Sequence, residues 1–178
     1  PDGRTISFDS DASGTFDIWA MDDSGANVRR LTGDRARDIS ATWSPDGSRI
    51  VFMSDRDGGF DAYTAPVRGG SGQAAADADV KRVTHTGSTW FPVFSPDGAT
   101  LAFHVGRDVH TMPVPSGVEG PPAGGALRRL TTDPANGMYP SWSPDGGSIA
   151  FMSWRNGKTE IFTMRADGTD QRVLVSMP

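Results

Sequence analysis

Residues 41–65, ATWSPDGSRIVFMSDRDGGFDAYTA, decide the fold of this chain because the same pattern returns further along it. Residues 92–114, PVFSPDGATLAFHVGRDVHTMPV, and residues 140–164, PSWSPDGGSIAFMSWRNGKTEIFTM, align with this stretch without gaps over about fifteen positions. Residues 1–21, PDGRTISFDSDASGTFDIWAM, repeat the unit without its first segment. Self-similarity of this length predicts an architecture built of repeats.

The tripeptide Pro-Asp-Gly predicts a tight corner in every unit. Proline presets the backbone angle φ, the aspartate side chain accepts hydrogen bonds from nearby backbone N–H groups, and glycine accepts a positive φ. The tripeptide begins at Pro1, Pro45, Pro96 and Pro144, at spacings of 44, 51 and 48 residues. This period is typical of one blade of a β-propeller.

Each unit predicts four short strands separated by turns. We expect the innermost strand just before the corner, at residues 39–44, 90–95 and 138–143. A second strand with a regularly placed phenylalanine follows, as in Ile50-Val51-Phe52, and a third and fourth strand complete the unit. The predicted fold is therefore an all-β propeller of four-stranded antiparallel blades, with units starting near residues 1, 39, 90 and 138 and with no inner strand in the first.

The Ser-Pro-Asp-Gly corners at residues 44–47, 95–98 and 143–146, with the strands around them, resemble the TolB-like β-propeller repeat, a Pro-Asp relative of the WD-type repeat. The resemblance covers the chain, so residues 1–178 are expected to form a single propeller domain or part of one. It implies a ring of six blades, used in some members as a periplasmic protein-binding module and in others as the propeller in front of a peptidase domain. It also implies a periplasmic or secreted location.

The number of units raises the question of how the ring closes. A blade is a small sheet with two apolar faces, and neighbouring blades are what cover them. Four units leave three possibilities: a piece of a longer propeller, a strained four-bladed ring, or two chains that share one eight-bladed ring. A homo-oligomer that completes the ring is therefore a possible partner arrangement.

Composition excludes several classes of function. Lys plus Arg number 17 and Asp plus Glu number 22, so the formal net charge is −5 and nucleic acid is not an expected partner. No run approaches the roughly 18 apolar residues that cross a bilayer, so membrane insertion is not expected. There is no cysteine, which removes disulfides, thiolate metal ligands and a thiol nucleophile.

Metal binding and catalysis receive little support from the residues. The acidic stretch around Asp55, Asp57 and Asp61 departs from a calcium-loop pattern and falls where every unit has a turn. His104 and His110 occupy slots that hold Met or aromatic residues in the other units, which indicates packing, and His85 lies in a loop. No Gly-x-Ser-x-Gly motif occurs. We therefore predict no cofactor, no metal and no catalytic residue.

Two insertions interrupt the repeat between the third and fourth strands, at residues 66–80 and 113–126. Both are rich in Gly, Ala and Pro, which is typical of tolerated surface loops. A contact arm for a partner is the alternative interpretation.

The best candidate for a binding surface is one mouth of the central channel. The connections between units, residues 33–40, 85–91 and 132–139, gather there and differ from unit to unit. Their charged and aromatic side chains are typical of protein interfaces, although Trp90 and Tyr139 could equally pack between inner strands. The candidate ligand-binding residues are Arg35, Arg37, Asp38, His85, Trp90, Asn136 and Tyr139.

Three functions are compatible with this pattern. The first is a non-catalytic propeller scaffold that binds a protein or peptide partner at the channel mouth. The second is the propeller portion of a serine peptidase, where it would gate access to a hydrolase domain. The third is a small-ligand or metal-dependent lyase-like propeller that uses His85 with nearby acids.

Overall fold

The computed structural model describes residues 2–67, 79–114, 127–133 and 137–176, in which four antiparallel sheets are formed. The fifteen strands are β1 (Thr5–Ser10), β2 (Asp17–Asp22) and β3 (Arg29–Arg30); β4 (Asp38–Trp43), β5 (Arg49–Ser54), β6 (Asp61–Pro66) and β7 (Lys81–Arg82); β8 (Thr89–Phe94), β9 (Thr100–Val105), β10 (Asp108–Pro113) and β11 (Arg128–Arg129); and β12 (Met138–Trp142), β13 (Ser148–Ser153), β14 (Glu160–Arg165) and β15 (Arg172–Ser176). The fold class predicted from the repeat is thus confirmed.

Each sheet is a blade in which consecutive strands are neighbours. The first blade has the order β1-β2-β3, and the other three have four strands each, in the orders β4 to β7, β8 to β11 and β12 to β15. The predicted inner strands correspond to β4, β8 and β12, and the described residues of the first blade include no such strand. In the described part of the chain, no helix is long and apolar enough to cross a membrane.

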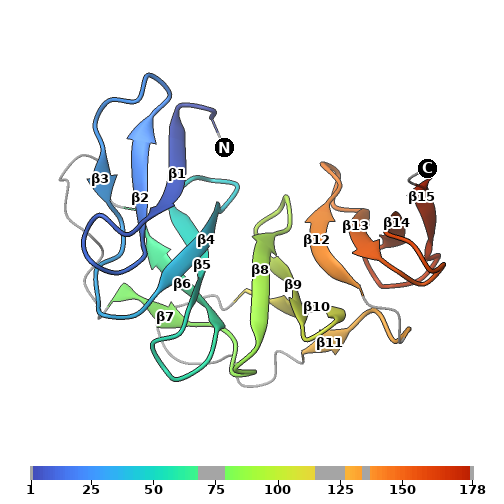
Figure 1. Cartoon of the computed structure of the whole chain (residues 1–178). Helices are drawn as coiled ribbons and strands as arrows, with labels where there is room; N and C mark the ends of the chain where they lie inside the picture. Colours follow the sequence, from blue (N-terminus) through green and yellow to red (C-terminus); the bar gives the residue numbers. More distant parts are fainter. Residues whose placement is uncertain (1, 68–78, 115–126, 134–136, 177–178) are drawn as a thin grey trace.

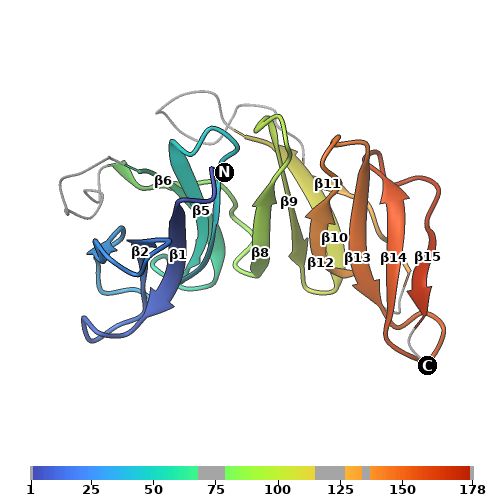
Figure 2. The ribbon, with the colours of Figure 1, turned by 90° about the horizontal axis from the view of Figure 1, so that it is seen from above.

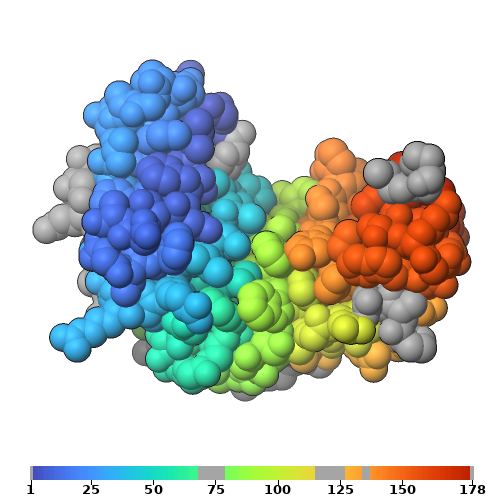
Figure 3. Space-filling view, in the orientation of Figure 1, coloured from blue at the N-terminus to red at the C-terminus, as the bar shows by residue number. Residues whose placement is uncertain are grey.

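The blades stand side by side in an arc around the inner strands (Figure 1). Strand β4 contacts both β1 and β8, and β8 also contacts β12, so the inner strands form the hub of the arc. The view from above shows the four sheets in sequence order (Figure 2). A notch separates the first blade from the last in the space-filling view (Figure 3), so the described residues form an open arc and not a closed four-bladed ring.

The Ser-Pro-Asp-Gly corners have the geometry that their residue types predict. In the second blade Gly47 has a φ of 71° and its N–H donates to the Ser44 carbonyl at 2.9 Å. The Asp46 carboxylate accepts from the Ser44 hydroxyl at 2.6 Å and from the Ser48 N–H at 3.0 Å. These hydrogen bonds lower the pKa of Asp46 to about 2.

The hydrophobic core consists of layers between adjacent blades. In the layer between the second and third blades, Val51 and Ala62 pack with Leu101 and Phe103. In each layer the following blade contributes a buried phenylalanine, at Phe52, Phe103 and Phe151. The same arrangement recurs between the first and second blades and between the third and fourth blades. We call these interfaces between adjacent blades joints, and each of them stabilises the fold in the same way.

An aspartate at the start of the third-strand position is paired with an arginine in the first three blades. Asp61 of β6 receives an ion pair from Arg82 at 2.7 Å and a hydrogen bond from Thr84 at 2.7 Å. Burial acts to raise the pKa of Asp61, but these bonds outweigh burial and keep its pKa below the usual value. Asp17 pairs with Arg30 and Asp108 with Arg129 in the same way. The repeated Arg-Arg-Leu-Thr and Lys-Arg-Val-Thr segments therefore have a structural role.

Candidate functional site

The inner strands share a bulge near their first residues. Pairing with the second strand of the blade shifts between Ile39 and Thr42 in β4, and at the corresponding places in β8 and β12. Ser40, Phe91 and Tyr139 lie in these bulges with φ values of 57°, 51° and 54°. Positive φ is unfavourable for residues with a Cβ, above all for aromatic ones, and such strain clusters at functional sites.

The residue that faces each bulge differs from joint to joint. The fifth residues of β1, β5, β9 and β13 are Asp9, Met53, His104 and Met152. The carboxylate of Asp9 accepts the N–H of Ser40 at 3.0 Å from both oxygens. The Sδ of Met53 accepts the N–H of Phe91 at 3.1 Å. The bulges of β4 and β8 are thus each tied to the preceding blade by an acceptor at the same strand position.

At the third joint this slot holds a histidine inside an aromatic group. The rings of Phe91 and His104 are stacked with centroids 5.9 Å apart, and Tyr139 lies 5.5 Å from His104 and 4.8 Å from Phe91. We call Phe91, His104 and Tyr139 the hub cluster. His104 is 5% exposed, and its burial lowers the pKa of the imidazole below the usual 6.5. Phe91 and Tyr139 are 36% and 47% exposed.

A second group of rings lies at the connection between the second and third blades. The guanidinium of Arg37 lies 5.0 Å from the centre of the Phe60 ring, which in turn lies 5.1 Å from Trp90. Arg37 also pairs with Asp55 at 2.8 Å, and its side chain is 59% exposed. We call Arg37, Phe60 and Trp90 the mouth cluster. An exposed arginine held on an aromatic surface is a common anchor in protein interfaces.

Backbone contacts hold the mouth cluster in place. Phe60 lies in the hairpin between β5 and β6, and its carbonyl accepts the N–H of Thr89 at 2.8 Å. A Cβ added to Gly59 would lie 2.6 Å from the Gly87 carbonyl oxygen, so glycine permits the close approach of the two segments. The hairpin of one blade is therefore fixed to the start of the next inner strand.

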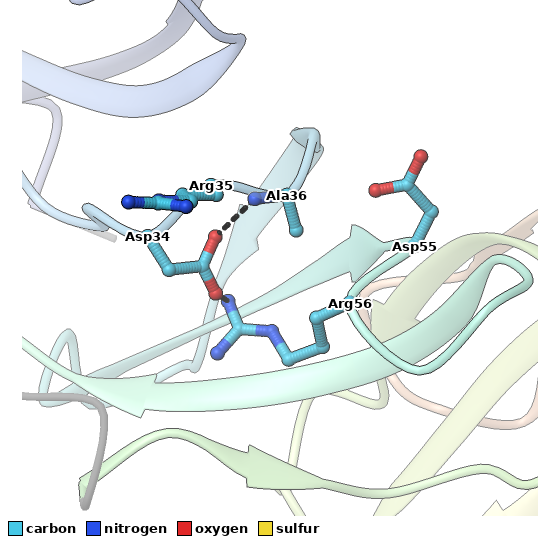
Figure 4. Close-up of a pocket in the computed structure, with 5 residues that line it drawn as sticks. All are labelled: Asp34, Arg35, Ala36, Asp55 and Arg56. Carbon is cyan, nitrogen blue, oxygen red and sulfur yellow. Dashed lines mark hydrogen bonds and ion pairs between the residues drawn. The ribbon is translucent and has the colours of Figure 1, made fainter.

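A polar depression of about 640 Å³ lies beside this cluster, lined by Asp34, Arg35, Ala36, Asp55 and Arg56. Figure 4 shows the Asp34 carboxylate between the Ala36 N–H, at 2.7 Å, and the Arg56 guanidinium, at 2.9 Å. Positive and negative side chains are balanced there, so the depression does not select for one sign of charge.

Arg56 and Asp38 stabilise the connection between the first and second blades, residues 33–40. Arg56 contacts Asp38 at 3.0 Å and lies over the Tyr63 ring at 4.8 Å. Asp38 is fully buried, and this burial raises the pKa of its carboxyl above the usual value, against the opposing effect of bonds from Ser54 and Arg56. Asp38 therefore acts within the protein and does not face the solvent at the mouth.

The other candidate residues have different surroundings. Arg35 and His85 are exposed, Trp90 is half-buried with its Nε1 donating to the Ser88 hydroxyl at 3.3 Å, and Asn136 is outside the described residues. The insertions fall largely outside them as well, at residues 68–78 and 115–126.

The structure thus brings Arg37 and Trp90 together through Phe60, and Tyr139 together with Phe91 and His104. The sequence prediction omitted Phe60, Phe91 and His104 from the site. Phe91 could have been found from its place directly before Pro92, where Tyr139 precedes Pro140.

The described residues bring no three His, Asp or Glu side chains together in a group that could hold a metal ion. His85 is exposed, and His104 and His110 are buried against aromatic rings.

Four-stranded antiparallel blades packed face to face around a hub of inner strands define a β-propeller, here present as an open arc. Residues 1–109 match the family model described as the TolB beta propeller domain, so the chain belongs to that family.

Two curated relatives share this repeat. An uncharacterised protein of Agrobacterium fabrum is 35% identical over 105 residues, covering 58% of this chain and 33% of the relative. The Tol-Pal system protein TolB of Desulfosudis oleivorans is 35% identical over 126 residues, covering 71% of this chain and 26% of the relative. The chain therefore spans a third or less of the length of these proteins.

Solved structures show the same fold. A putative TolB from Agrobacterium tumefaciens superimposes with a TM-score of 0.77 at 23% identity, covering 98% of this chain and 62% of that one. A puromycin-hydrolyzing peptidase of Mycobacterium tuberculosis superimposes with a TM-score of 0.69 at 16% identity, covering 98% of this chain and 29% of that one.

Proposed function

We propose that this propeller is a non-catalytic scaffold that binds a protein or peptide partner at the mouth of its channel. The observation that carries the proposal is the mouth cluster, in which an exposed arginine lies over the Phe60 ring and that ring contacts Trp90 of an inner strand. Aromatic and arginine side chains contribute most of the binding free energy in typical protein interfaces.

The mouth cluster is suited to binding because it is already ordered. The Asp55 carboxylate holds Arg37 in place by accepting one hydrogen bond from its backbone N–H and one from its guanidinium Nε, each of 2.8 Å. Burial acts to raise the pKa of Asp55, but these bonds lower it overall, which keeps the carboxylate charged. Little side-chain entropy is then lost when a partner docks.

The remaining candidate residues have distinct parts in the proposal. Arg35, His85 and Tyr139 are exposed and would contact the partner directly. Asp38 would position Arg56 beneath the connection and make no contact. Asn136 stays in the proposal on its sequence position alone.

The test is selection of binding peptides on the immobilised chain, followed by measurement of their affinities for variants. We expect Arg37→Ala, Trp90→Ala and Tyr139→Ala each to weaken binding by about tenfold or more, because each removes an anchor. The matched control is Arg172→Ala, which removes an exposed arginine from the outer strand β15. Unchanged affinity in all three variants, with the melting temperature preserved, would refute the proposal.

A gating propeller in front of a serine peptidase is the second candidate. The fold likeness to a puromycin-hydrolyzing peptidase supports it, but only at the level of the fold. The test is the length of the reading frame in the gene. A gating function requires about 200 further residues that alternate between strands and helices. The lyase-like alternative depends on His85, which no neighbouring pair of metal ligands supports in the described residues.

The end faces of the arc bear on the oligomeric state. Ile6, which is 43% exposed, lies on the face of the first blade that no described blade covers. Ile161 lies on the uncovered face of the last blade. These faces are of the two types that pack together between adjacent blades, so either further blades of a longer propeller or a second copy of this chain would cover them. Light scattering separates the two, because a monomer mass with intact folding would contradict the second copy.

A further inference from the structure

The joint between the third and fourth blades contains a hydrogen-bond acceptor that is not used. The Nε2 atom of His104 is buried and has no hydrogen-bond partner in the described part of the chain. Its Nδ1 lies 3.1 Å from the Gly106 carbonyl oxygen, which can only accept. Nδ1 must therefore carry the hydrogen, and Nε2 presents its lone pair.

The other joints show that this slot normally holds a satisfied acceptor. Asp9 and Met53 occupy it in the first two joints, and each accepts the N–H of a bulge residue. An unsatisfied acceptor of this kind costs about 1–3 kcal/mol when it stays buried. The third joint is therefore the one place in the described hub where an added hydrogen-bond donor would relieve such a cost.

The surroundings of His104 determine which donor fits. Phe91 lies nearly parallel to the imidazole, at an interplanar angle of 18°, and Tyr139 meets it edge-on at 64°. Strands β9 and β12 are in contact, so the three rings come from neighbouring strands of the hub (Figure 1). The Tyr139 ring is nearly half exposed, and an exposed side chain changes rotamer rapidly. The proposed site requires this side chain to move so that a ligand can reach Nε2.

We propose that the hub cluster of Phe91, His104 and Tyr139 binds an arginine side chain of the partner, with a guanidinium N–H donating to Nε2 of His104 and the guanidinium plane stacked on the aromatic rings. The inference rests on the proposed function, for which it names the recognised group. A guanidinium is planar, carries five donors and no acceptor, and stacks on aromatic faces.

Charge favours the same group. The imidazole of His104 is held neutral by its burial, so it does not repel a cation. The carboxylate of Asp9 occupies the equivalent slot at the first joint and is exposed, and the chain carries a net charge of −5. Lysine is the weaker fit, because its ammonium is a strongly hydrated point charge without a flat face.

The test is a titration of the whole chain with N-acetylargininamide, followed through the ring nitrogen resonances of the three histidines. We expect the Nε2 resonance of His104 to shift as its lone pair accepts a hydrogen bond, while His85 stays unchanged. N-acetyllysinamide and N-acetyltryptophanamide are the comparison probes, and we expect both to bind more weakly by about tenfold.

The repeat itself supplies a variant that keeps the fold. His104→Met installs the residue present at Met53 and Met152. This variant should weaken binding of N-acetylargininamide by about tenfold or more without loss of the blade. His85→Ala is the control and should leave the affinity unchanged.

Three outcomes would overturn the inference: no shift at His104 in the folded protein, equal affinity in His104→Met, or equal or tighter binding of the lysine or tryptophan probe. None of them bears on peptide capture by the mouth cluster, which is measured separately with Arg37→Ala. The inference and the proposed function can therefore fail independently.

Discussion

The backbone N–H of Phe91 donates to the Sδ of Met53 across 3.1 Å, joining the inner strand of the third blade to the second strand of the second. Phe91 has a positive φ of 51°, and this conformation directs its N–H away from the strand pairing of its own blade. The same relation holds between Ser40 and Asp9 at the preceding joint. The hub is therefore held together by side-chain acceptors as well as by hydrophobic contact.

Removal of the Met53 acceptor should destabilise the protein. Met53→Leu conserves volume but leaves the N–H of Phe91 without its partner, at a cost of about 1 kcal/mol in the free energy of unfolding. Met152→Leu is the matched control, because Met152 occupies the same slot in the last blade of the arc, where no described bulge faces it. Chemical denaturation measures both, and equal losses in the two variants would show that the sulfur acceptor does not matter.

Relief of the backbone strain at the bulge in β4 should stabilise the protein. Ser40 has a φ of 57°, where glycine is not penalised and alanine is. We expect Ser40→Gly to be more stable than Ser40→Ala by roughly 0.5–1 kcal/mol, since both lose the hydroxyl and both keep the N–H that Asp9 accepts. Thermal unfolding compares the two, and an alanine variant as stable as the glycine variant would contradict the assignment of strain.

One added hydroxyl group should give the buried indole N–H of Trp142 a hydrogen-bond partner. Trp142 Nε1 is buried without a partner in the described residues, whereas the equivalent Trp43 Nε1 donates to the Ser7 hydroxyl at 3.1 Å. Ala102 is the third residue of β9, as Ser7 is of β1. Ala102→Ser should therefore raise the free energy of unfolding by about 1 kcal/mol. Ala150→Ser is the control, and a similar response of both variants would argue against pairing with the indole.

The acidic corner should make stability depend on pH. The pKa of Asp46 is about 2 in the folded protein against an ordinary value of 3.8, so the charged form is favoured by folding. Its contribution to stability is complete above the ordinary pKa and is lost as the pH falls through about 2. The melting temperature of the wild type should thus exceed that of Asp46→Asn at pH 5, and the difference should shrink toward pH 2. Asp23→Asn controls for the change in net charge, and a pH-independent difference would contradict the assignment.

The blade architecture could be predicted almost completely from the sequence. The corner at Ser95-Pro96-Asp97-Gly98 depends on local conformational preferences, and Gly98 has the expected positive φ of 72°. Phe52 and Phe103 recur in register because both fill a layer between blades. The predicted inner strand at 39–44 is displaced by one residue from β4, whose pairing with β5 begins at Asp38.

The candidate site was less predictable because its members come from different blades. Arg37 and Trp90 are linked only through Phe60, which lies in the hairpin between β5 and β6. The acidic residues of that hairpin predicted only a turn. His104 was expected to pack, and it is buried. Its Nε2 has no partner in the described residues, and the neighbouring Tyr139 ring comes from a different blade. No local pattern in the sequence reports that relation.

Sequence alone determined the repeat, its corners and the apolar faces of each blade, because these follow from interactions between residues close in the chain. Tertiary structure decided that the four blades form an open arc, that aromatic residues accept a positive φ at the hub, and that one histidine keeps a free acceptor there. The physical reason is that packing between blades supplies the free energy that holds residues in conformations their local preferences oppose.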